Sequence, residues 1–99
     1  MINIVYKKPH EEPISMEIEN DWEQFQKLVD GYIEVVPAND DKSIVMLINE
    51  DGKLKGLDVN VWIENTCIAG NVIFIQQDLN GEFISLTDDM IKSIIKILK

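Results

Sequence analysis

Cys67 and His10 are the two residues that would support nucleophilic catalysis, in which a base activates a thiolate. They are the only cysteine and the only histidine of the chain, and nothing in their spacing links them. The apolar stretch around Cys67 favours a buried structural cysteine, and His10 follows Pro9 in an expected exposed loop. The sequence therefore predicts no catalytic residues, and it excludes both a zinc site of several His and Cys ligands and an internal disulfide.

Carboxylates are concentrated between residues 11 and 23, where paired acids would suit general acid–base catalysis or a metal with oxygen ligands. Their order favours a solvated face instead. Glu17 and Glu19 fall on the polar side of an expected strand, and Asp21 and Glu23 in the first turn of an expected helix. We therefore expect no metal and no cofactor, and an acidic surface formed by Glu11, Glu12, Glu17, Glu19, Asp21 and Glu23.

The stretch 52–56, Gly-Lys-Leu-Lys-Gly, resembles a phosphate-binding loop but lacks the spacing of that motif and does not precede a helix. A hairpin is the favoured interpretation of this segment. Its two lysines still provide the basic pair in the middle of the chain. A nucleotide site would combine phosphate contacts with base stacking, from the residues Asn49, Lys53, Lys55, Asn60 and Trp62.

Trp62 is the candidate anchor for a protein partner, because it alternates with apolar residues and falls beside Asn60 and Glu64 on the polar side of an expected strand. The alternative is that a helix covers this face, so that Trp62 belongs to the core. Tyr32 raises a similar question at the start of the preceding strand. The candidate partner-binding set also includes Glu34 and Glu50.

The composition limits the classes of partner. The chain has 99 residues, 18 acidic side chains, nine lysines, no arginine and a formal net charge of -9. This length suits one domain, residues 1–99, and the charge argues against binding to nucleic acid or to anionic membranes. Carboxylates that imitate the phosphates of DNA are one explanation of the charge, and ordinary solubility is the other. The N-terminus is not typical of a signal peptide and no apolar run would span a bilayer, so we expect a cytoplasmic protein of a bacterial cell.

The hydrophobic pattern predicts an α+β domain, with a mostly antiparallel sheet and two helices packed on it. In the first half we expect strands at 2–6, 14–18, 32–36 and 44–48, the last of them central and buried on both faces. A helix over 21–30 should begin at an Asn20 N-cap, bury Trp22 and Phe25 among others, and end at Gly31 in the left-handed conformation.

The second half of the chain is dominated by turn signals. Asp51-Gly52 predicts a hairpin with a short return strand over 53–55, followed by a strand over 57–63. Asn80-Gly81 predicts a hairpin turn between strands at 72–76 and 82–85. Thr87 should cap a final helix whose buried stripe contains Ile91, Ile94, Ile95 and Leu98.

Three segments resemble a known family: 28–36 (LVDGYIEVV), 49–57 (NEDGKLKGL) together with Asn60, and 68–70 (IAG). They are similar to domain of unknown function 3846, a group of small proteins of phages, plasmids and conjugative elements. The resemblance covers most of the chain. It implies a mobile-element origin and no particular activity.

These observations lead to one main hypothesis and two alternatives. The main hypothesis is a non-enzymatic phage or mobile-element protein that uses an acidic surface to inhibit or modulate a host protein with a basic surface, such as a defence nuclease. Anti-restriction and anti-CRISPR inhibitors are proteins of this kind. The first alternative is a small-ligand binding protein that sequesters a nucleotide signal. The second is a structural protein that self-assembles into a homo-oligomer through a sheet edge.

Overall fold

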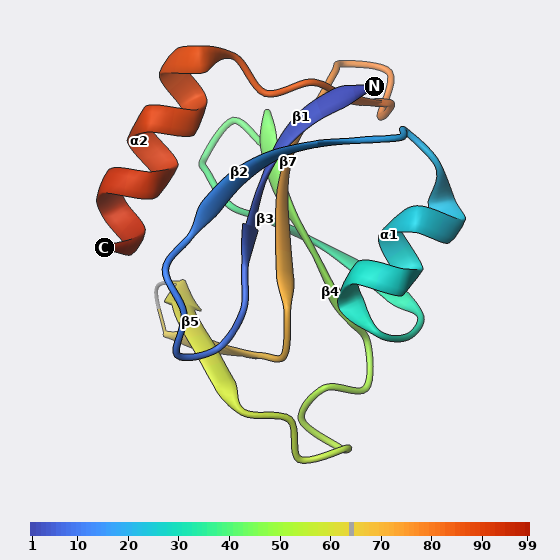
Figure 1. Cartoon of the computed structure of the whole chain (residues 1–99), viewed down its shortest axis with the longest axis vertical. Helices are drawn as coiled ribbons and strands as arrows, with labels where there is room; N and C mark the ends of the chain where they lie inside the picture. Colours follow the sequence, from blue (N-terminus) through green and yellow to red (C-terminus); the bar gives the residue numbers. More distant parts are fainter. Residues whose placement is uncertain (64) are drawn as a thin grey trace.

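A computed structural model of the chain describes residues 1–63 and 65–99 (Figure 1). Glu64, which the alternation placed beside Trp62, lies outside the described residues. The strands are β1 (Ile2–Lys7), β2 (Ile14–Ile18), β3 (Ile33–Pro37), β4 (Ile44–Asn49), β5 (Val59–Ile63), β6 (Thr66–Ala69), β7 (Val72–Gln77) and β8 (Phe83–Ile84). The helices are α1 (Trp22–Val29) and α2 (Asp88–Leu98). Neither is long and apolar enough to cross a membrane.

One antiparallel sheet organises the molecule. Its strand order is β2-β1-β7-β4-β3, with the short β8 paired to the end of β7. β2 and β3 therefore form opposite edges, while β7 lies in the middle. β5 and β6 form a separate two-stranded antiparallel ladder.

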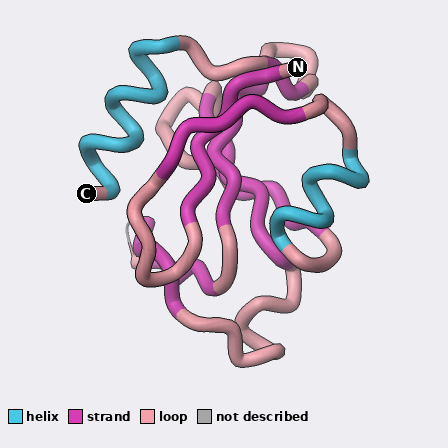
Figure 2. Tube along the Cα trace, viewed as in Figure 1, coloured by secondary structure: helices cyan, strands magenta, loops and turns pink. Residues whose placement is uncertain are grey.

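Each face of the sheet carries one helix, and Figures 1 and 2 show the two helices on opposite sides of the strands. Alternate residues of β4 divide the core, because successive side chains of a strand point to opposite faces. Val45 and Leu47 pack in the cluster that contains Phe25 of α1, while Met46 packs in the cluster that contains Ile94 of α2. The β5–β6 ladder contributes Val61 and Ile68, among others, to the second cluster. The predicted α+β class, with a mostly antiparallel sheet and two helices, is confirmed.

Several local predictions are also confirmed. β4 is a central strand buried on both faces, and the turn before β8 has Gly81 at a φ of 83°, the region that favours glycine. Thr87 caps α2, and its side-chain oxygen accepts a hydrogen bond of 3.1 Å from the Met90 amide. β2 is less buried than predicted: Ile18 is in the core, but Ile14 is half-exposed at the sheet edge.

The predicted ends of α1 are wrong by one residue each. The N-cap is Asp21, whose carboxylate accepts a hydrogen bond of 2.8 Å from the Glu23 amide, whereas the Asn20 side chain donates to the Phe83 carbonyl. At the other end Asp30 has the left-handed conformation, with a φ of 63°. Gly31 is required for space instead, because a Cβ there would lie 2.6 Å from Asn49 Nδ2.

The predicted hairpin at Asp51-Gly52 is wrong. Residues 50–56 form consecutive turns with no return strand, closed by backbone bonds such as Lys55 N to Asp51 O at 2.8 Å. Gly52 is buried, and a Cβ on it would lie 2.8 Å from the Ala69 carbonyl oxygen. The glycine is thus explained by close contact with β6, a strand that the sequence pattern did not predict, rather than by a type I′ turn.

Candidate functional site

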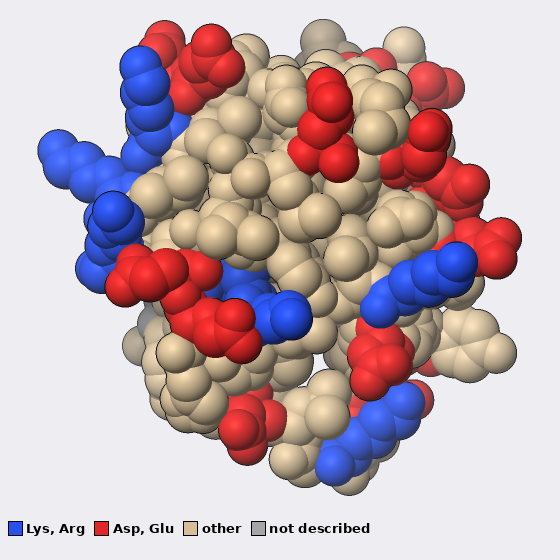
Figure 3. Space-filling view, viewed as in Figure 1, with Lys and Arg blue, Asp and Glu red and all other residues tan. Residues whose placement is uncertain are grey.

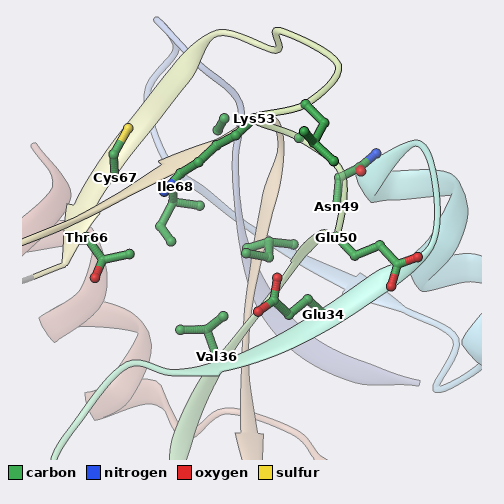
Figure 4. Close-up of a pocket in the computed structure, with 12 residues that line it drawn as sticks. Glu34, Val36, Asn49, Glu50, Lys53, Thr66, Cys67 and Ile68 are labelled. Atoms are coloured by element: carbon green, nitrogen blue, oxygen red, sulfur yellow. The ribbon is translucent and has the colours of Figure 1, made fainter.

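Four of the predicted binding residues line one pocket of about 250 Å³ between β3, the 50–56 turn and β6 (Figure 4). Its apolar surface comes from Val36, Ile48 and Ile68. The four predicted residues are Glu34, Asn49, Glu50 and Lys53.

These four side chains differ in orientation, as Figure 4 shows. Glu34 points into the pocket, whereas Glu50 points away from β6. Lys53 extends across the pocket towards Ile68. Glu34 and Lys53 make no salt bridge; within residues 1–63 and 65–99 the one contact between an acidic and a basic side chain is from His10 Nε2 to Asp58 Oδ2 at 3.2 Å. The pocket therefore offers an apolar floor with one carboxylate directed into it and one ammonium extended across it, which are not paired with each other.

Asn49 is buried with 3% of its surface exposed, and its amide is used by the fold. Nδ2 donates to the Val29 and Asp30 carbonyls at 3.3 and 3.1 Å, and Oδ1 accepts from the Asp51 amide at 2.8 Å. These bonds tie the end of α1 to the 50–56 turn. Both N–H donors of the side chain are therefore used within the fold and are not available to a ligand in the pocket.

Asn60 has a comparable structural position on β5. Its Nδ2 donates to the carbonyls of Lys7 and Gly70, both at 2.7 Å. Its Oδ1 accepts from the Lys7 ammonium at 3.0 Å, and that ammonium also donates to the Lys8 carbonyl at 2.8 Å. Lys7 is only 7% exposed. Asn60 therefore provides a hydrogen-bond acceptor for the ammonium of a buried lysine.

The other predicted ligand residues do not line the pocket. Lys55 lies beside Gly31, with its Nζ 3.5 Å from the position of a Cβ on that glycine. Tyr32 and Trp62 are 69% and 65% exposed, so of the two alternatives for Trp62 the structure has the exposed one. Trp62 pairs across the ladder with Cys67, which is half-buried rather than fully buried.

All six predicted acidic residues are exposed, but they form two groups. Glu11 and Glu12 lie in the loop before β2. We call the others, which lie between β2 and the first turn of α1, the acidic group: Glu17, Glu19, Asp21 and Glu23. Figure 3 shows carboxylates gathered at the upper right, where β2 leads into α1. Because β2 and β3 are opposite edges of the sheet, this group lies away from the pocket.

Trp22 is a surface residue that sequence reasoning assigned to the buried side of α1. It is 49% exposed and lies between Asp21 and Glu23 at the start of α1. Its ring is stacked on Phe83 with centroids 6.3 Å apart and an interplanar angle of 5°, and it meets the edge of Phe25 at 6.4 Å. The helical spacing of Trp22 and Phe25 gave no signal of this exposure.

Among the described residues, two titratable groups have shifted pKa values, and neither belongs to these sites. Burial raises the pKa of Tyr6, whose hydroxyl donates to the Leu28 carbonyl at 2.6 Å. Hydrogen bonds from Ser43 lower the pKa of Asp41. Within residues 1–63 and 65–99, no three His, Cys, Asp or Glu side chains are grouped so that they could hold a metal ion.

The molecule is thus a small α+β protein with an acidic, aromatic surface at one sheet edge and an apolar pocket at the other. Its sequence matches the model of the family described as domain of unknown function (DUF3846) over residues 2–99, and the chain belongs to that family. No curated protein and no solved structure matches it significantly.

Proposed function

We propose that this chain is a non-enzymatic accessory protein of a phage or another mobile element, and that it binds and inhibits or modulates a host protein with a basic surface. The observation that carries this proposal is Trp22, an exposed tryptophan that stacks on Phe83 and lies between the acidic residues Asp21 and Glu23 in the chain. Interfaces depend on a few buried anchors, among which tryptophan is enriched. Because its ring is already ordered, Trp22 would lose little conformational freedom on binding.

The chemistry of this surface favours arginine or lysine as the partner's contact residues. A guanidinium can stack on the face of an indole and form paired hydrogen bonds with a carboxylate. Carboxylates without basic partners also produce a long-range field that speeds encounter with a positive surface. A nuclease that binds nucleic acid has such a surface, so a defence nuclease is the partner class that we favour.

The test compares two variants of equal charge. E17Q/E19Q removes two charges from the acidic group, and D88N/D89N removes two from exposed positions at the start of α2. Each immobilised protein is incubated with host lysate at about 50 mM and at about 500 mM salt, where screening differs strongly. We expect the natural chain and D88N/D89N to retain the same basic protein at low salt, and E17Q/E19Q to retain at least about fivefold less.

A third variant, Trp22→Leu, keeps an apolar contact with Phe83 but removes the indole face, and we expect it to weaken capture as well. Capture that is insensitive to salt, or equally reduced in both charge variants, would contradict the proposal. Failure to capture any host protein at low salt would also contradict it.

The structure offers less support to the nucleotide-binding alternative. Two of its five candidate contact residues are Asn49 and Asn60, and the amides of both are hydrogen-bonded within the fold. Trp62 and Lys55 do not line the pocket that Lys53 reaches. A thermal-shift screen with nucleotides checks this conclusion, since a ligand that binds only the folded state raises the melting temperature.

A further inference from the structure

The pocket beside β3 continues into a second one of about 340 Å³, and Val36, Thr66 and Ile68 line both. Together they form what we call the β3–β6 groove, bounded by β3 and the residues after it on one side and by the β5–β6 ladder on the other. The 50–56 turn closes one end, where Gly52 packs against the Ala69 carbonyl. The other end contains Asn39 and Asp40.

The groove has the chemistry of a peptide site. Its middle is apolar, formed by Val36, Ile48 and Ile68, and a carboxylate lies towards each end: Glu34 in the first pocket and Asp40 in the second. A ligand with an apolar centre and positive ends would complement the two carboxylates. Lys53 also extends across the first pocket, so the ligand's basic group must displace its ammonium to reach Glu34, whereas no basic residue among those described lines the second pocket. Glu34 lies in β3 and Asp40 three residues beyond its end at Pro37, in the following turn. An extended probe of five residues, at about 3.3 Å each, spans roughly 16 Å.

The wall formed by β6 adds backbone hydrogen bonds to this pattern. β6 pairs with β5 and, among the described strands, with no other. In an antiparallel pair, every second residue directs its N–H and C=O groups away from its neighbour. β6 therefore has a free edge beside the groove, and a peptide strand added to such an edge is a common mode of recognition.

We infer that the β3–β6 groove binds an extended segment of a partner protein, with an apolar side chain over Val36 and Ile68 and basic side chains at Glu34 and Asp40. The segment pairs as a third strand with the free edge of β6. This inference deepens the proposed binding function and rests on it, but it concerns a surface at the opposite sheet edge from the acidic group.

The probe is the synthetic peptide acetyl-Lys-Thr-Val-Thr-Lys-amide, whose pattern is the same in both chain directions. Alternate side chains of a strand share a face, so both lysines and the valine can point to the floor together. Titration into the isotope-labelled full chain, followed by amide NMR, should shift Thr66, Cys67 and Val36. The peptide with glutamates in place of the lysines should bind at least about fivefold more weakly, because it meets Glu34 and Asp40 with like charge.

Strand pairing is tested by two singly N-methylated peptides, one methylated at the valine and one at the threonine that follows it. Neighbouring N–H groups point to opposite edges of a strand, so one isomer should lose a hydrogen bond to β6 and bind about fivefold more weakly than the other. Equal binding of the two isomers overturns the strand-pairing model.

The matched protein variants are Glu34→Gln and Glu12→Gln, which remove the same charge from exposed positions inside and outside the groove. We expect weaker peptide binding only for Glu34→Gln, because Glu12 lies in the loop before β2, at the opposite edge of the sheet. Peptide-induced shifts confined to residues 17–23, or an equal loss in both variants, would refute the groove while leaving the proposed function of the acidic group intact. Host-protein capture that is unchanged in E17Q/E19Q, together with peptide binding that depends on Glu34, would refute the proposed function of the acidic group and leave the groove intact.

Discussion

The buried ammonium of Lys7 gives the sharpest test of how this fold is held together. Within the described residues its recorded partners are neutral oxygens, the Lys8 carbonyl at 2.8 Å and Asn60 Oδ1 at 3.0 Å. We predict that Asn60→Ala destabilises the protein much more than Lys7→Met. The first change leaves a buried cation with one partner fewer, whereas the second removes the cation itself.

The magnitude follows from the bonds that each change removes. Asn60→Ala removes one hydrogen bond to a charged group, worth roughly 1.5–3 kcal/mol, and two bonds to carbonyls, worth about 1 kcal/mol each. The total is roughly 4 kcal/mol, a large part of the 5–15 kcal/mol typical of a domain. Lys7→Met keeps most of the apolar stem and retains the Asn60 bond to the Lys7 carbonyl, so we expect a cost of about 1–2 kcal/mol.

The assay is urea unfolding followed by tryptophan fluorescence. With a slope of about 1–3 kcal/mol per molar urea, the predicted difference separates the two midpoints by roughly 1 M or more. The double variant K7M/N60A should cost less than the sum of the two single changes, because they share one hydrogen bond. If Lys7→Met is as destabilising as Asn60→Ala, the ammonium reaches other partners and the argument from a stranded charge is wrong.

Three further predictions concern other parts of the fold. Asp21→Ala should cost about 1 kcal/mol and lower the melting temperature by roughly 4–8 °C, because it removes the cap of α1, whereas Asn20→Ala should cost less; a thermal melt compares them. Gly31→Ala should cost about 1–3 kcal/mol in urea unfolding, since its Cβ would lie 2.6 Å from Asn49 Nδ2, and an unchanged midpoint would contradict this. The raised pKa of Tyr6 favours the protonated form in the folded state, so its contribution is complete below the unfolded pKa of about 10 and is lost as pH rises through the folded value; Tyr6→Phe should reduce the fall in stability above about pH 10.

The features that could be predicted from the sequence are those decided by neighbouring residues. The Thr87 cap bonds an amide three residues away, and the turn at Gly81 needs only a local left-handed conformation. The buried run of β4 follows from its own composition. At the start of α1, the predicted cap Asn20 and the observed cap Asp21 are residue types with similar capping propensity. Propensity alone therefore did not place the cap at Asp21.

The features that could not be predicted depend on pairs distant in sequence. Gly52 looked like a hairpin glycine because the Ala69 carbonyl that requires its small size lies 17 residues away. Asn60 looked like a surface amide on an alternating strand, yet it binds Lys7 at a separation of 53 residues. Trp62 and Trp22 show the same limit, since exposure depends on which element covers each face.

The order of the strands separates the two candidate surfaces and so gives them different roles. The acidic group lies at the β2 edge and the β3–β6 groove at the β3 edge, in a molecule measuring 32 × 28 × 23 Å. Charges act over a Debye length of about 8–10 Å, so the acidic group affects encounter before contact, whereas a groove acts only once a segment is seated. Neutralising Glu17 and Glu19 should therefore lower the association rate and its dependence on salt, while changes in the groove should raise the dissociation rate. If one partner engages both edges at once, the two sets of changes will weaken the same complex, and their effects will add because the sites share no residue.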